Sequence, residues 1–118
     1  MLRADLLPEA WLAPAKVRQL RALLRHRVSL VRLGTQLRNR IHAVAADHGY
    51  DRPASYWTGP GRGWLAGLDL PPVSREVVAD CLAVIDGLAP VIDRIDGELR
   101  QHAKADPRVK TLTTLPGV

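Results

Sequence analysis

The chain has 118 residues, a formal net charge of +5 at pH 7 and a sequence pI of about 10.1. Its residues are 47% hydrophobic but only 4% aromatic, with no Phe, and this composition favours aliphatic helix packing over a rounded mixed core. The single cysteine excludes an internal disulfide. The sequence shows no signal peptide and no uncharged apolar run of the ~18 residues needed to span a bilayer. We therefore expect a cytoplasmic protein without a membrane partner.

Residues 1–14 are predicted to form a short apolar lead-in segment, and Pro14 suits the first position of a helix because the N–H that it lacks would be unpaired there. Residues 15–48 are predicted to form one long helix, because their apolar residues recur every three or four positions. Gly49 follows this segment and can adopt the left-handed conformation that ends a helix.

This first helix is strongly basic. Eight Lys and Arg residues precede its first acid, Asp47, and residues 1–62 hold 11 basic against 4 acidic residues, whereas residues 63–118 hold 6 against 8. Such a helix needs an anionic partner, which is either the acids of a neighbouring helix or the phosphates of a nucleic acid. On the second reading, the candidate nucleic-acid-binding residues are Arg18, Arg21, Arg25, Arg32, Arg38 and Arg40.

Residues 49–73 are predicted to be a connector, because glycines and prolines are concentrated there. The glycines at 59, 61 and 63 lack the lysine of a phosphate-binding loop, so a turn-rich cap that includes a helical turn or two is the favoured reading. The aromatic residues of the connector, together with Arg52 and Arg62, can stack on bases, but burial of Trp57 and Trp64 is the favoured alternative.

Residues 74–105 are predicted to form a second long helix with Ser74 as its N-cap. Pro90 predicts a kink near residues 86–90 or, as the alternative, a full break of the helix. Apolar residues alternate by three and four positions and form the predicted packing or dimer seam, which consists of Val78, Cys81, Ile85, Leu88, Ile92, Ile95 and Leu99. A flanking row at Val77, Val84 and Val91 indicates more than one partner helix and hence a homo-oligomer.

Two helices of similar length joined by this connector predict an all-α fold, a long antiparallel helical hairpin or coiled coil over residues 15–105. The four histidines have no neighbours at metal-ligand spacing, so no metal site is predicted. An enzyme that binds a small anion between helices is disfavoured, because the seam of the second helix carries no charge. No small-molecule substrate is therefore expected.

Four runs of the sequence together resemble one protein family: LLPEAW, RNRIHAVAADHG, WTGPGRGWLAGLDLPP and ADPRVKTLTTLPGV. The chain resembles the central part of the DEDD transposases of bacterial insertion sequences, a group described as bridge-RNA-guided recombinases. The resemblance extends over all 118 residues and is densest in those runs. Residues 106–118 look like the start of the helix-hairpin-helix that opens the C-terminal domain of the family, truncated before its second helix.

This resemblance implies a parent protein with a nuclease domain that carries four acidic residues and uses Mg²⁺, a helical coiled-coil segment and a C-terminal domain with a catalytic serine. No position of this chain matches either catalytic motif, so we assign no catalytic residue and no cofactor, and we expect the chain alone to be inactive. The implied function is that of the helical segment, which joins protomers and contacts DNA and structured RNA during transposition. The alternative is a structural oligomerisation module whose arginines pair with Asp80, Asp86, Asp93 and Glu98.

Overall fold

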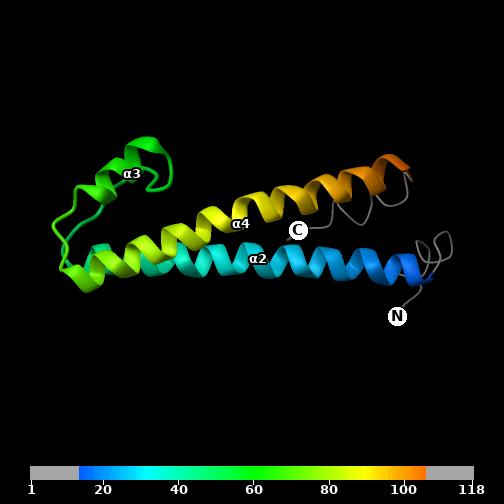
Figure 1. Cartoon of the computed structure of the whole chain (residues 1–118), viewed down its shortest axis with the longest axis horizontal. Coiled ribbons are helices and arrows are strands. Elements are labelled where there is room, and N and C mark those ends of the chain that lie inside the picture. The colour runs from blue at the N-terminus through cyan, green and yellow to red at the C-terminus, as the bar shows by residue number, and fades with distance from the viewer. Residues whose placement is uncertain (1–13, 106–118) are drawn as a thin grey trace. The chain divides into compact units, whose positions relative to one another are not determined.

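The computed structural model describes residues 14–105, which form three helices and no strand. The helices are α2 (Pro14–Asp47), α3 (Gly59–Ala66) and α4 (Pro72–Ala105), as Figure 1 shows in chain order. The predicted all-α helical hairpin is therefore confirmed. None of these three helices has an apolar stretch long enough to cross a membrane. The predicted lead-in, apart from Pro14, and the predicted start of a helix-hairpin-helix at 106–118 lie outside the described residues.

Helix α2 begins and ends where local sequence signals place its ends. It starts at Pro14, as predicted, and its last helical residue is Asp47. Gly49 has a positive φ of 79°, and its N–H donates to the Ala46 carbonyl at 3.0 Å while the N–H of Tyr50 donates to the Ala45 carbonyl at 2.9 Å. These two bonds form a Schellman motif, which needs a left-handed residue at the position of Gly49. The prediction that Gly49 ends the helix is confirmed.

Helix α4 differs from its prediction at two points. It begins at Pro72, and the N–H of Arg75 donates to the carbonyl of Pro71 at 2.9 Å, so Ser74 lies inside the first turn and the prediction that it is the N-cap was wrong. Pro72 is suited to the first helical position because it has no N–H to leave unpaired. The helix continues through Pro90 to Ala105, so a full break is excluded, and the kink stays a prediction.

The chain divides into two compact units, each of which we describe separately. The described part of the first unit comprises residues 14–33 of α2 and 87–105 of α4. Its core is aliphatic and consists of Val17, Leu20, Leu24, Ile95 and Leu99, with Leu23, Leu30 and Val91 packed against it. Of the predicted seam residues in this unit, Ile95 and Leu99 are buried, whereas Leu88 and Ile92 are half-buried.

The second unit comprises residues 34–86, that is, the end of α2, the connector with α3, and the start of α4. The three seam residues in this unit, Val78, Cys81 and Ile85, are all buried. The other buried apolar residues of the unit are Leu37, Ile41, Ala45, Tyr56, Leu65, Leu68 and Leu70. The connector therefore contributes to the core, and α3 is the short helix that the sequence predicted within it.

Candidate nucleic-acid interface

The first unit carries a row of exposed arginines on α2. Arg18, Arg25 and Arg32 are spaced seven residues apart, and the side chains of all three are exposed. Since seven residues are close to two helical turns, the three lie on one side of the helix. We call these three residues the arginine row. Arg21, the fourth residue of the predicted set in this unit, falls within about 60° of them on a helical wheel but is half-buried.

Arg27 lies on the opposite side of α2 and pairs with α4. Its Nε donates to Oδ1 of Asp96 at 2.5 Å, and the two side chains are only 21% and 31% exposed. Arg27 follows Leu20 by seven residues and therefore shares the side of the helix that faces the core. This pair was not predicted from the sequence. The signal that could have predicted it is that Arg27 lies on the same side of the helix as the apolar Leu20.

Three acids of α4, Asp86, Asp96 and Glu98, pair with arginines that do not belong to the arginine row. Glu98 pairs with Arg94 one turn earlier on its own helix, at 3.6 Å. In the second unit, Asp86 pairs with Arg62 of α3. Within residues 14–105, the arginine row forms no ion pair. The pairing that the structural alternative predicts, with acids opposite all of these arginines, is therefore not found in the described residues.

The spacing of the arginine row explains how it is tolerated without acids. At 1.5 Å per residue, guanidinium groups seven residues apart are separated by roughly 10 Å along the axis. This is about one Debye length at 0.1 M salt, so their mutual repulsion is mostly screened. A polyanion laid along the helix meets all three charges at once and releases its own counterions. Repulsion among the three residues of the row is therefore weak, and all three are exposed to an anionic partner.

The predicted residues Arg38 and Arg40 belong to the second unit and have different surroundings. Arg40 is exposed. Arg38 is half-buried, and its Cζ lies 5.8 Å from the centroid of the Trp57 ring, a cation–π arrangement. The structure thus divides the six predicted residues. Three form the exposed arginine row and Arg21 is half-buried beside it, whereas in the second unit Arg40 is exposed and Arg38 lies over the Trp57 ring.

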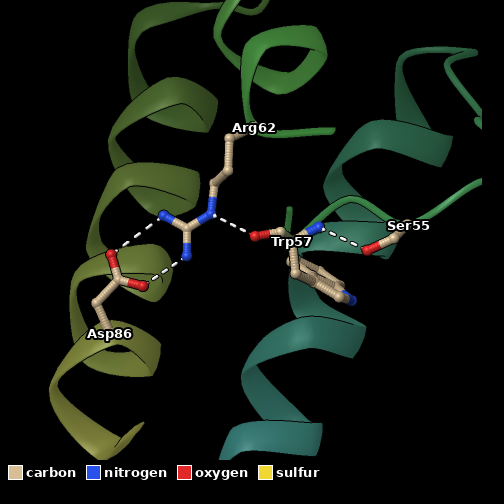
Figure 2. A network of polar contacts seen from close by, with 4 residues as sticks. All are labelled: Ser55, Trp57, Arg62 and Asp86. Atoms are coloured by element: carbon tan, nitrogen blue, oxygen red, sulfur yellow. Dashed lines mark hydrogen bonds and ion pairs between the residues drawn. The ribbon is translucent and has the colours of Figure 1, made fainter. Parts of the chain in front are cut away.

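The connector is held to α4 by a polar network around Arg62 (Figure 2). The guanidinium donates to both carboxylate oxygens of Asp86, at 3.1 and 2.5 Å, and its Nε donates to the carbonyl of Trp57 at 3.3 Å. The N–H of Trp57 donates in turn to Oγ of Ser55 at 3.1 Å. The hydrogen bonds from Arg62 favour the ionised carboxylate and lower the pKa of Asp86. Arg62 therefore links the connector to α4, and its stacking on a base stays a prediction.

Four rings of the second unit pack together. Tyr56 is buried, and its ring centroid lies 4.2 Å from that of His42 and 4.7 Å from that of Trp64. Its hydroxyl donates to Oδ1 of Asp51 at 3.2 Å, and burial raises the pKa of the phenol. Trp57 contacts both His42, at 5.3 Å, and Tyr56, at 5.5 Å. Trp57 and Trp64 are each half-buried, so each indole keeps part of its surface in solvent.

In the part of the chain that the structure describes, no three His, Cys, Asp or Glu side chains are grouped as metal ligands. The features that can bind a ligand are the exposed positive charge on α2 and the partly exposed aromatic surface beside Arg38. Comparison of the chain with protein-family models, curated proteins and solved structures gave no match.

Proposed function

We propose that the chain is the helical segment of an insertion-sequence transposase of the DEDD type, and that it contacts DNA or structured RNA and joins protomers. The observation that carries the nucleic-acid part is the arginine row, with three exposed guanidinium groups on one side of α2 and no ion pair to them within residues 14–105. The assignment to this transposase family comes from the sequence resemblance and is part of the proposal.

Phosphates are better partners for the arginine row than the acidic residues of α4 are. The acids of α4 that pair with arginines bind Arg27, Arg62 and Arg94. An exposed guanidinium also has five N–H donors in a planar fork that matches phosphate oxygens. A row of such groups along a helix gives sequence-independent affinity for a polynucleotide backbone, which is what a segment that lies against nucleic acid needs.

Replacing the arginine row in the triple variant R18A/R25A/R32A is expected to weaken binding to duplex DNA and to an RNA hairpin. Each phosphate contact contributes about 0.7–0.9 to the slope of log affinity against log salt, so the triple variant should lose a slope of roughly 2–3. Fluorescence anisotropy with end-labelled nucleic acids, measured over a series of salt concentrations, gives both the affinity and the slope.

The matched control is R94A/R100A/K104A, which removes three exposed cations from α4 of the same unit and changes the net charge equally. If the two triple variants lose affinity and slope equally, binding depends on net charge alone and the arginine row is not the interface. Salt-insensitive binding of the unaltered chain, or no binding at low salt, contradicts the nucleic-acid part of the proposal.

The protomer-joining part rests on an exposed apolar row on α4 in the second unit. Val73 is 70% exposed, Val84 is 46% exposed, and Val77 between them is half-buried. All three fall within about 40° of one another on a helical wheel. Valine side chains exposed in a row along one helix favour packing against another helix, and a second copy of the chain supplies the same row.

Sedimentation velocity of the chain at increasing concentration is expected to show self-association, and V73S/V84S should shift the population towards the monomer. The exposed Ala79 lies about 140° from the middle of the valine row, so A79S serves as the control and should leave the association unchanged. A chain that stays monomeric at high concentration would remove this part of the proposal while leaving the nucleic-acid part in place.

A further inference from the structure

We infer that Trp57 and Arg38 form a binding site for an unpaired nucleobase of single-stranded RNA or DNA, in addition to the phosphate contacts of the arginine row. This inference rests on the proposed function, because it assigns a second kind of nucleic-acid contact to the same protein. It differs in chemistry, since a base that stacks on a ring contributes affinity without neutralising a phosphate.

The indole of Trp57 is held in place from several sides. Its backbone is fixed at both polar groups, because its N–H donates to Ser55 and its carbonyl accepts from Arg62 (Figure 2). Its ring meets His42 edge-on, with an interplanar angle of 89°, and Tyr56 at a tilt of 43°. A ring that is already ordered loses little conformational entropy when a ligand binds. The half-buried indole is therefore a preorganised surface.

The surroundings of Trp57 favour an anionic ligand with a flat ring. Arg38 places its guanidinium 5.8 Å from the indole centroid and has no ion pair within residues 14–105. A cationic ligand, such as a methylated lysine, would be repelled by this charge. A nucleotide supplies both a π-surface for the indole and a phosphate for the guanidinium. An unpaired base is required, because a base within a duplex has both of its faces stacked.

The two residues make separable contributions, which the salt dependence of binding resolves. Binding is measured with a labelled oligouridine and a labelled oligothymidine, which are single-stranded and weakly stacked, and with a duplex of mixed sequence and the same length. We expect W57A to bind the single strands roughly ten- to a hundredfold more weakly, with the salt slope unchanged. R38A should lower both the affinity and the slope, the slope by about 0.7. Both variants should bind the duplex within about twofold of the unaltered chain.

W57F keeps a flat ring at this position and is expected to retain part of the affinity, which covers the case in which W57A fails to fold. Tyr50, another half-buried aromatic residue of the connector, gives the control Y50A, which should bind normally. Oligodeoxyuridine differs from oligouridine in the sugar alone, so a difference in affinity between these two identifies RNA or DNA as the source of the base. Two outcomes overturn the inference. In the first, W57A and W57F bind single strands as tightly as the unaltered chain does; in the second, they lose affinity for single strands and duplex equally. If the first outcome is found while R18A/R25A/R32A still binds nucleic acid more weakly, the proposed function stands without this inference.

Discussion

Replacing Gly61 with Ala is expected to lower the free energy of unfolding by about 2–3 kcal/mol or more, a large effect for the addition of one methyl group. A Cβ at this position would lie 2.6 Å from the carbonyl carbon of Tyr56 and 2.7 Å from its Cα, and would overlap the carbonyl oxygen of Ser55. These are backbone atoms, which cannot rotate away as the end of a side chain can. Urea denaturation followed by circular dichroism measures the loss.

Gly63, two residues further along α3, provides a matched control because a Cβ there would meet nothing within 4 Å. G63A should raise the free energy of unfolding by up to ~1 kcal/mol, since Ala is the better helix former. Opposite signs for the two substitutions are the expected result. If G61A were as harmless as G63A, the close approach of α3 to residues 55–56 would be wrong, and so would the placement of Trp57 next to them.

Replacing Ile95 with Ala is expected to lower the free energy of unfolding by about 2–5 kcal/mol. The side chain is 0% exposed and belongs to the core of the first unit together with Val17, Leu20, Leu24 and Leu99. The substitution removes its contacts with these aliphatic residues and leaves a cavity, and no aromatic ring in that cluster can fill the space. Urea denaturation gives the magnitude, and I95V, with an expected loss of about 0.5–1.5 kcal/mol, serves if I95A does not fold.

Leu33 lies in the same unit and is 38% exposed, so L33A removes an aliphatic side chain without opening a closed cavity. Its expected cost is below about 1.5 kcal/mol, because part of the side chain is already in water. Equal losses for I95A and L33A would mean that Ile95 is not enclosed, and the core of the first unit would have to be reassigned.

Local sequence patterns were sufficient for the helical elements. Apolar residues at helical spacing predicted the two long helices, Pro14 marked the start of the first and Gly49 its end, and each of these signals acts within one or two turns of the residue concerned. The same spacing places Arg18, Arg21, Arg25 and Arg32 on one side of the first helix. In the structure Arg18, Arg25 and Arg32 are exposed, whereas Arg21 is half-buried. Their contact with nucleic acid stays a prediction until it is measured. Ser74 shows the limit of local signals, because Pro72 was an equally good starting residue.

Local sequence patterns did not show which arginines pair with acids or aromatic rings, because these contacts arise in the tertiary structure. Arg27 and Asp96 are 69 residues apart in the chain, and Arg62 and Asp86 are 24 apart, so no helical or turn periodicity relates them. The position of Arg38 over Trp57 and the contact of Gly61 with residues 55–56 likewise depend on how the connector folds back within the second unit. The existence of the two long helices and the residues that share a side of each could be predicted from the sequence, because these properties follow from backbone geometry within a few residues. Only tertiary packing decided which charges and rings meet, because residues distant in the chain come together through burial of the whole apolar surface.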